Sequence, residues 1–415
     1  MSLTVTNAEL DGSIVGLRAD GGTITAVGPD VAAQPGDEVL DGTGMALLPG
    51  LVNGHTHAAM TLFRGYGADL PLQEWLETRI WPVEAKLTAD DVYWGTRLAC
   101  VEMIRSGTVH FWDMYWQPLA VARAVHDAGI RATVSEVLVD GLDEKRGAEI
   151  QRAAAEGLEQ MIDYAPRVQP ALGPHGVYTV SAGSLRWCGE QSEARDLPVH
   201  IHLSETRKEV DDCVDVNGER PAPYLDRLGL LTPRVLLAHG TWLDDTELHL
   251  VADRGSTIVT NPVSNLKLAV GRIFPYPDAS DRGIPLGLGT DGAASNNSLD
   301  LFQDMKVLAL AQKHAAADPA TLHASETWAL ATGQRSPLLG HSGKLASGEA
   351  ADFLLVRRDA PELNPGDLLA NLVYAAAGSV VDTTVVDGRV LMRGGVVDGV
   401  DEVRERVTAC ARRLG

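Results

Sequence analysis

Short apolar runs separated by turn-forming residues mark both ends of the chain. Strand-like runs occupy residues 3–5, 14–17, 24–27, 352–356, 384–386 and 390–392. An Asp-Gly-Gly segment at 20–22 lies between two of the early runs and is typical of a hairpin. We therefore expect residues 1–46 and 341–415 to meet in one small composite β-sandwich domain, with a terminal helix, around an inserted middle.

Between these ends, continuous apolar runs alternate with helical stretches. The runs span residues 47–52, 108–112, 131–139, 168–172, 199–203, 235–238, 257–260 and 284–288. Such runs suit parallel strands that are buried on both faces. The clearest helix begins at Thr88, has Asp91 as a capping-box partner, and ends before Gly107. Residues 47–340 thus predict an α/β fold, a (β/α)8 TIM barrel. The competing doubly wound sheet is disfavoured because no G-x-G-x-x-G follows an early strand.

Composition narrows the class of protein. The 415 residues are 45% hydrophobic and 22% charged, which is typical of a globular protein. With 56 acidic and 35 basic residues the net charge is −21, so we expect no nucleic-acid partner. This acidic excess fits either a saline cytoplasm or ordinary solubility charge.

Cysteine usage and hydropathy indicate the compartment. The four cysteines include no C-x-x-C pair, which argues against a disulfide framework or a thiolate metal site. The first residues have no basic and apolar leader pattern, and no run of 18 apolar residues occurs. We expect a cytoplasmic protein with no membrane partner.

Candidate metal ligands lie where predicted barrel strands end, which is where barrel enzymes place their catalytic groups. His55 and His57 follow the first run, and alternate residues of an extended segment point to the same side. His202 ends the fifth run, and Asp291 leaves the eighth between glycines. Three imidazoles and one carboxylate suit a zinc ion.

Three further polar residues lie near these ends. Glu205 follows His202 by three residues, where it is placed to move protons beside the metal, although a glutamate starting a helix is the alternative. His239 ends the sixth run and is available to bond a metal-bound water. His200 lies one layer deeper, and we expect a hydrogen-bonded core histidine.

The sequence indicates one metal ion rather than two. Binuclear barrels of this general kind bridge their metals through a carboxylated lysine at the end of strand four. Here that strand ends in Gly-Pro-His175, and no lysine occurs between Lys145 and Lys208. The cysteine-ligated zinc deaminases are also excluded, because the required cysteine pair is missing.

Several motifs together resemble the amidohydrolase superfamily. More narrowly, they are similar to the methylthioadenosine/S-adenosylhomocysteine deaminases and their chlorohydrolase relatives. The motifs are PGLVNGHTH (49–57), HAAMTLFRG (57–65), EWL (74–76), PVE (82–84), GPH (173–175), HLSE (202–205), AH (238–239), NPVSNLKL (261–268), GTDG (289–292) and DGAASNN (291–297). The resemblance covers nearly the whole chain, including both ends.

The resemblance implies the same four ligands and the same proton-transfer groups, Glu205, His239 and Asp291. It implies that Glu84 binds the ribose hydroxyls and His175 the nucleoside side of the substrate, with Trp75 over the base or 5′ group. The alternatives are that Glu84 favours a helix start and that Trp75 is core. Asp113, at the end of the second run, is expected to support the site.

The resemblance also implies an activity: a zinc-dependent hydrolytic deaminase, with one Zn²⁺ per chain, acting on an adenine nucleoside. The candidate substrates are methylthioadenosine, 5′-deoxyadenosine, adenosine and S-adenosylhomocysteine. Alternative reactions with the same set of site residues are deamination of guanine or a pterin and dechlorination of a triazine. A non-catalytic scaffold is disfavoured because such proteins typically lose metal ligands. The oligomeric state is left open, a homo-oligomer included.

The 5′ group is the point where this chain departs from its relatives. Those that accept S-adenosylhomocysteine tend to place an arginine near the end of strand three, which binds the amino acid's carboxylate. The comparable residue here is interpreted as Glu136, which would repel that group, and Arg146 in the next loop is the compensating candidate. We expect a preference for a small, uncharged 5′ group.

Overall fold

The computed structural model describes residues 2–67, 69–70 and 72–414. Eight parallel strands lie side by side in chain order, with the last against the first. They are β6 (Leu51–Thr56), β7 (Thr108–Met114), β8 (Arg131–Leu138), β9 (Val168–Pro174), β10 (Val199–Leu203), β11 (Val235–His239), β12 (Thr257–Thr260) and β13 (Leu286–Leu288). The predicted (β/α)8 barrel is confirmed, and all eight strands fall within or beside the predicted runs.

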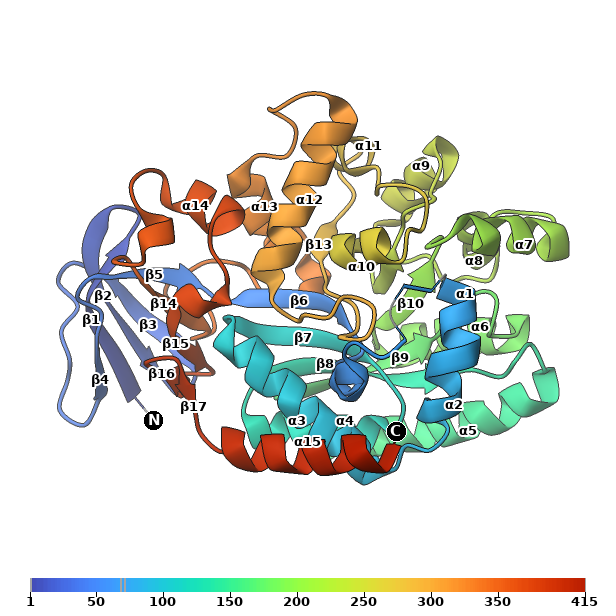
Figure 1. The fold of residues 1–415 in the computed structure, drawn as a ribbon, viewed down its shortest axis with the longest axis horizontal. Helices are drawn as coiled ribbons and strands as arrows, with labels where there is room; N and C mark the ends of the chain where they lie inside the picture. The colour runs from blue at the N-terminus through green and yellow to red at the C-terminus, as the bar shows by residue number, and fades with distance from the viewer. Residues whose placement is uncertain (1, 68, 71, 415) are drawn as a thin grey trace.

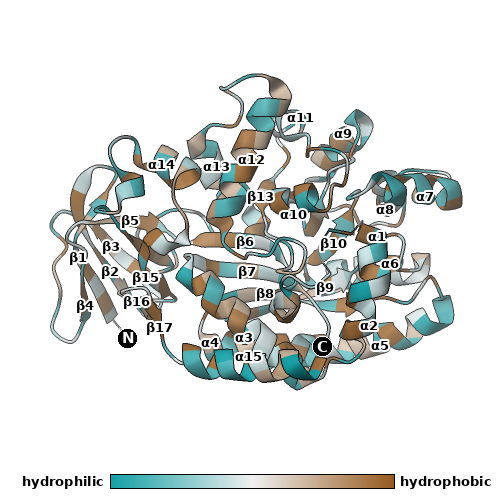
Figure 2. Cartoon of the chain, viewed as in Figure 1, coloured by the Kyte–Doolittle hydropathy of each residue, from teal (hydrophilic) through white to brown (hydrophobic). Residues whose placement is uncertain are grey.

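Helices cover the outside of the barrel between these strands (Figure 1). They include α3 (Ala89–Arg105), α4 (Pro118–Ala128), α5 (Glu144–Met161), α6 (Ala182–Arg195), α7 (Arg207–Asn217), α8 (Pro221–Arg227), α9 (Asp245–Arg254), α10 (Pro262–Lys267), α11 (Tyr276–Asp281), α12 (Leu301–Ala316) and α13 (Ala324–Ala331). The Thr88–Asp91 capping box at the start of α3 forms as predicted. Figure 2 shows α7, at the periphery, mostly in hydrophilic colours, as expected of a solvated helix.

Both ends of the chain meet in a second sheet, seen at the left of Figure 1 where blue and red strands lie together. Its path runs β17-β16-β15-β14-β5-β1-β2-β3, and β4 pairs with β1. The bounds are β1 (Ser2–Leu10), β2 (Ser13–Asp20), β3 (Thr23–Gly28), β4 (Glu38–Asp41), β5 (Met45–Pro49), β14 (Phe353–Arg357), β15 (Val381–Val386), β16 (Arg389–Arg393) and β17 (Val396–Val397). Two helices complete the C-terminal part, α14 (Leu368–Tyr374) and α15 (Val400–Leu414). Helix α15 packs along α3, so the chain end lies against the barrel.

The predicted first barrel strand is divided between the two sheets. Residues up to Pro49 belong to β5, which pairs antiparallel with β14, and β6 begins only at Leu51. Gly50 separates them because the chain passes very close to β7 there: a Cβ at this position would lie 2.3 Å from Val109 Cγ1. The boundary expected at residue 46 therefore falls inside β5.

Ion pairs fasten the second sheet to the amino-terminal end of the barrel. Arg131, the first residue of β8, donates to Asp352 at 2.9 Å and to Asp387 at 2.7 Å. Arg167 donates to the same Asp387 at 3.1 Å. Asp352 is buried, so this pairing is one of the charge-assisted contacts that each contribute roughly 1.5–3 kcal/mol. These contacts hold the end of the barrel that lies opposite the candidate site.

Among the residues that the structure describes, no helix has the length and apolar character needed to cross a membrane.

Candidate metal centre and active site

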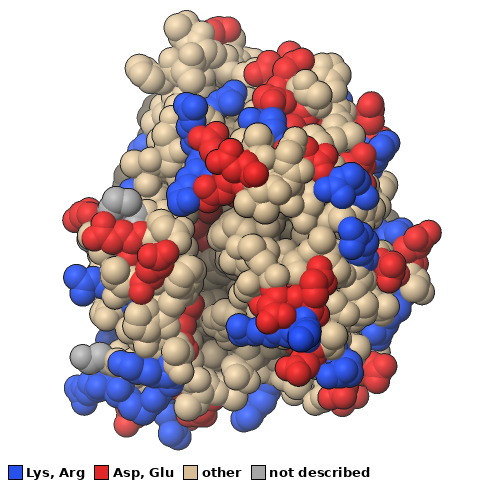
Figure 3. Space-filling model, turned by 90° about the vertical axis from the view of Figure 1, so that its right-hand side faces the viewer, with Lys and Arg blue, Asp and Glu red and all other residues tan. Residues whose placement is uncertain are grey.

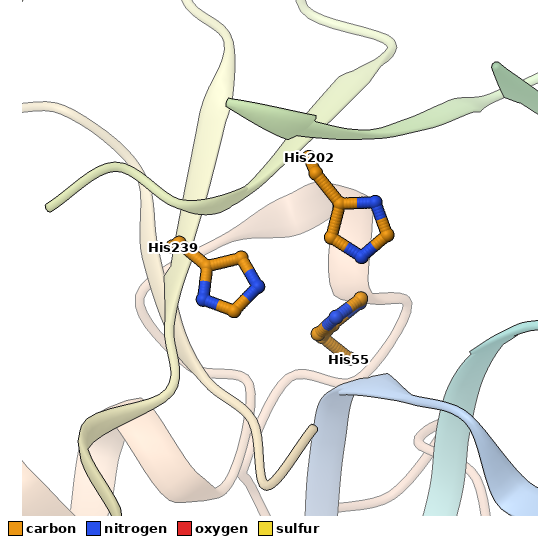
Figure 4. A group of neighbouring side chains, drawn as sticks. All are labelled: His55, His202 and His239. Atoms are coloured by element: carbon orange, nitrogen blue, oxygen red, sulfur yellow. The ribbon is translucent and has the colours of Figure 1, made fainter. Parts of the chain in front are cut away.

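Four ligating groups converge at the carboxyl ends of the barrel strands. His57 Nε2 lies 3.3 Å from His202 Nε2, and Asp291 Oδ1 lies 3.3 Å from His57 Nε2 and 3.5 Å from His55 Nε2. The rings of His55, His202 and His239 face a common space from three different strands (Figure 4). The structure thus brings together the four predicted ligands and the predicted fourth imidazole.

Hydrogen bonds on the far side of two rings determine which nitrogen faces this space. His57 Nδ1 lies 2.5 Å from the Met114 carbonyl oxygen, and His202 Nδ1 lies 2.7 Å from the His175 carbonyl oxygen. A carbonyl only accepts, so both Nδ1 atoms carry the proton and both Nε2 atoms present lone pairs. This is the usual arrangement of metal-binding histidines.

His55 is oriented by another imidazole. Its Nδ1 lies 2.8 Å from His200 Nε2, and His200 Nδ1 lies 3.2 Å from Ser135 Oγ. The His55 Nε2 atom is buried and has no hydrogen-bond partner among the described residues, as expected of an atom that needs a metal ion. Burial lowers the pKa of His55 to about 3, which keeps the ring neutral, the form that binds metal. The prediction that His200 is a hydrogen-bonded core histidine is confirmed.

Asp291 follows β13 with a left-handed backbone, φ +63°. Its carboxylate accepts from Ser264 Oγ at 2.6 Å, Ser295 Oγ at 2.8 Å and the Gly292 N–H at 2.8 Å. These donors stabilise the ionised carboxylate and fix its direction. With three imidazoles, the donor set is chemically suited to zinc.

Glu205 and His239 lie beside this centre. Both are buried, and Glu205 Oε1 lies 3.9 Å from His239 Nδ1. Burial raises the pKa of Glu205, although the neighbouring His239 opposes the shift, so the carboxyl holds a proton more readily than a solvated glutamate does. His239 Nδ1 also lies 2.8 Å from Asn265 Oδ1, and this bond directs its Nε2 into the pocket.

The centre forms the floor of a pocket that opens at the carboxyl ends of the strands. Figure 3 shows this face hollowed at its centre, with acidic side chains at the edge of the hollow. Aromatic and apolar side chains form much of the wall, namely those of Leu72, Trp75, Leu76, Ile80, Trp81, Tyr115, Trp116, Val137, Tyr178 and Leu268. Such a lining is typical of a site for a flat, partly apolar small molecule.

The three substrate-binding candidates all lie on this wall. Glu84, at the end of α2 (Trp81–Glu84), accepts from the Tyr115 hydroxyl at 2.7 Å, and burial raises the pKa of its carboxyl. His175 Nδ1 lies 2.9 Å from Thr179 Oγ1. Trp75, in α1 (Leu72–Trp75), is buried and donates from Nε1 to the carbonyl of Tyr66, so it is both core and pocket wall.

Asp113 supports the first strand end, as expected. Its Oδ1 accepts from Thr56 Oγ1 at 2.8 Å and from the Ala58 N–H at 2.6 Å. These two contacts lie on either side of His57 and hold its turn. Burial raises the pKa of Asp113 to about 6.

The structure corrects the interpretation of strand three. Side chains alternate along β8, and Glu136 points outward: a Cβ on Gly157 of α5 would lie 2.5 Å from Glu136 Oε2. Val137 lines the pocket instead. Arg146 is exposed in the first turn of α5 and is not among the residues that line the pocket. The expected repulsion from Glu136 is therefore wrong, and an apolar side chain stands where a charge was expected.

Sequence reasoning gave no role to several residues that organise the site. Asn265 lies in the NPVSNLKL motif, and Tyr115 directly follows the strand that carries Asp113. Both residues lie in or beside segments that the sequence analysis singled out. Their contacts with His239 and Glu84 join segments distant in the chain, so spacing alone contains no signal for them.

Comparison with known proteins agrees with this geometry. Residues 46–391 match the Amidohydrolase family. The chain is 48% identical over 403 residues to a 5′-deoxyadenosine deaminase of Methanoregula boonei, covering 94% of this chain and 90% of that protein. It is 43% identical over 403 residues to 5-methylthioadenosine/S-adenosylhomocysteine deaminase 1 of Archaeoglobus fulgidus, covering 96% and 94%.

Among solved structures, the chain resembles an adenosine deaminase from Xanthomonas campestris with bound zinc. The TM-score is 0.90 at 34% identity, and the alignment covers 96% of this chain and 93% of the other.

Replacing His200 tests whether it orients His55, a candidate metal ligand. His200→Leu leaves the His55 N–H without an acceptor, so we expect zinc affinity to fall about 10- to 100-fold, measured by competition with a chelator. His110→Leu is the control. His110 is also buried, but it lies near the amino end of β7, away from the candidate site, and bonds Thr133 of β8. Equal affinity loss in both variants would contradict the orienting role.

Proposed function

The chain belongs to the amidohydrolase family, and on that premise we propose that it is a zinc-dependent hydrolytic deaminase of an adenine nucleoside. The observation that carries the proposal is the convergence of three imidazole lone pairs and one carboxylate beside a buried glutamic acid, at the floor of an aromatic pocket. Relatives named as 5′-deoxyadenosine and methylthioadenosine/S-adenosylhomocysteine deaminases support the substrate class.

One zinc ion per chain is proposed, held by His55, His57, His202 and Asp291. When bound, the ion would act as a Lewis acid and lower the pKa of water toward about 7. A single ion is supported by the end of β9, where the chain has Pro174 and His175 rather than a bridging lysine.

The remaining chemistry belongs to the side chains. Asp291 accepts a proton as the water oxygen bonds to the amino-bearing ring carbon. Glu205, protonated at the start, delivers its proton to the adjacent ring nitrogen, which makes that carbon electrophilic. His239 donates or accepts a hydrogen bond at the attacking oxygen. The proton held by Asp291 then passes to the amino group, and the carbon–nitrogen bond breaks with release of ammonia. The hydroxyl proton returns to Glu205 as the ring carbonyl of the inosine analogue forms, so both side chains regain their starting states.

Substrate contacts are proposed for the pocket wall. Glu84 would accept hydrogen bonds from the ribose hydroxyls, because its carboxylate is held toward the pocket by Tyr115. His175 would bond the nucleoside, and Trp75 would cover the base or the 5′ group. Guanine, pterin and chlorotriazine substrates are the alternatives, and assays of ammonia and chloride release over a small heterocycle panel distinguish them.

Metal content tests the proposed ligand set. Purified protein should contain close to one zinc per chain, and His55→Ala should lose both the metal and the activity, because one of four ligands is removed. Elemental analysis after dialysis measures this. Two tightly held metal ions per chain would contradict the argument from the missing lysine.

Glu205→Gln tests the proton path. The variant should keep its zinc while kcat/KM falls by about 10²–10⁴, the usual contribution of a positioned general acid–base. The exposed Glu193, changed to Gln on α6, is the control for the substitution itself. Near-normal deamination by Glu205→Gln would show that protons move by another path.

The 5′ preference follows from Val137. Without a cation at this position of the wall, the carboxylate of S-adenosylhomocysteine lacks a charge-assisted bond of about 1.5–3 kcal/mol. At roughly 1.4 kcal/mol per tenfold, kcat/KM should favour methylthioadenosine, 5′-deoxyadenosine or adenosine at least tenfold. Steady-state kinetics on the four substrates measures the ratio. Equal turnover of S-adenosylhomocysteine would overturn this preference and implicate Arg146 or another cation.

A further inference from the structure

Glu209, in the first turn of α7, makes an unusual pair of contacts for its position. The helix is capped by Thr206, whose hydroxyl accepts from the Glu209 N–H at 3.1 Å. Thr206 and Glu209 thus have capping-box spacing, in which the glutamate carboxylate normally bonds the N–H of the capping residue. Instead, the Glu209 carboxylate accepts from the Ser204 N–H at 2.7 Å and the Glu205 N–H at 2.8 Å.

Two other helices of the same chain show the ordinary arrangement. At α3, the Thr88 N–H donates to Asp91 at 2.8 Å, and at α9 the Asp244 N–H donates to Glu247 at 3.1 Å. Both carboxylates bond the capping residue of their own helix. Glu209 passes over its capping residue and reaches back to the strand end, so helix capping does not account for its contacts.

The two N–H groups bound by Glu209 lie on either side of the Ser204 Cα, so they flank the bonds whose rotation sets φ and ψ of Ser204. Ser204 has φ +50°, a left-handed conformation that is strained for an L-residue. Fixing the nitrogens before and after its Cα fixes this turn, and the turn decides where the next side chain, Glu205, points. Ser204 and Glu209 are both buried, so solvent water is poorly placed to replace the carboxylate.

A carboxylate suits this task better than other side chains. Burial raises the pKa of Glu209 to about 7, and the two N–H bonds oppose that shift by favouring the ionised form. Each carboxylate oxygen accepts one N–H, whereas a glutamine would present its own NH₂ group to one of the two donors. On the opposite side, the Ser204 carbonyl accepts from the Trp242 N–H at 2.8 Å, which ties the turn to the loop after β11. The turn is therefore held between the loop that follows His239 and the first turn of α7.

We propose that Glu209 is a positioning residue that sets the direction of Glu205 by fixing the Ser204 turn. The inference rests on the proposed function, in which Glu205 transfers the proton. Removing the tether leaves the metal ligands and the substrate wall in place. The loss therefore falls on the chemical step and not on substrate binding or zinc content.

Glu209→Gln tests the proposal in the zinc-loaded enzyme. We expect kcat to fall about 10- to 100-fold, as for a small misplacement of a reacting group, with KM within twofold and zinc content unchanged. Asp91→Asn is the control: it removes a capping carboxylate that is not among the residues lining the pocket, so it should lower the unfolding temperature but leave kcat unchanged. Normal kcat in Glu209→Gln overturns the proposal.

A double-mutant cycle distinguishes tethering from a general structural role. If Glu209 acts through Glu205, adding Glu209→Gln to the Glu205→Gln enzyme should cost less than twofold in kcat. An equal loss in both backgrounds overturns the proposal. Full activity of Glu205→Gln alone would contradict the proposed proton transfer by Glu205. Equal losses in the two backgrounds, with Glu205→Gln impaired, would contradict only the positioning role of Glu209.

Glu209→Asp provides a second variant, should Glu209→Gln fold poorly. The shorter carboxylate keeps its charge but reaches only one of the two N–H groups, so kcat should lie between the wild-type and Gln values. A kcat for Glu209→Asp equal to that of wild type overturns the proposal.

Discussion

Lone pairs that face one another across about 3.3 Å are the constraint on which the site depends. Imidazole nitrogens without protons and an ionised carboxylate repel each other unless a cation lies between them. The barrel holds them there because each outer nitrogen or oxygen is engaged elsewhere, by a carbonyl, a second imidazole or a hydroxyl. The surrounding polar network therefore prepares a metal centre rather than merely tolerating buried polar groups.

Strained backbone accompanies this arrangement at three strand ends. Ser204, His239 and Asp291 adopt φ values of +50°, +75° and +63°, although none is glycine. Each follows or ends a barrel strand and carries, or adjoins, a group assigned to the chemistry. In each case a buried hydrogen bond opposes the strain: Glu209 at the first, Asn265 at the second and Ser264 at the third. Such placement is typical of sites where geometry is fixed before substrate arrives.

The sequence indicated the barrel and the ligands because both are local patterns. A buried parallel strand is a short apolar run, and a ligand is the polar residue that directly follows it. Which side chains of a strand face the pocket is harder to predict, because an error of one residue exchanges the inward and outward positions. Glu136 was expected at the pocket wall, but Val137 lies there and Glu136 faces α5. The division at Gly50 and the reach of Glu209 past Thr206 depend on contacts with β7 and with the turn after β10. The Thr206–Glu209 spacing by itself is that of an ordinary capping box.

The direct passage from β5 into β6 has a consequence for the order in which the molecule is made. Strand β5 leads into His55 within a few residues, yet its antiparallel partner is β14, near the far end of the chain. A growing chain emerges from the ribosome with all four proposed metal ligands before residues 353–357 exist. Strand β5, which leads into the strand that carries His55, gains its partner β14 only after the whole barrel has been synthesised. The segment that leads into β6 is therefore anchored to the second sheet late, and the long sequence separation of this pairing favours slow assembly.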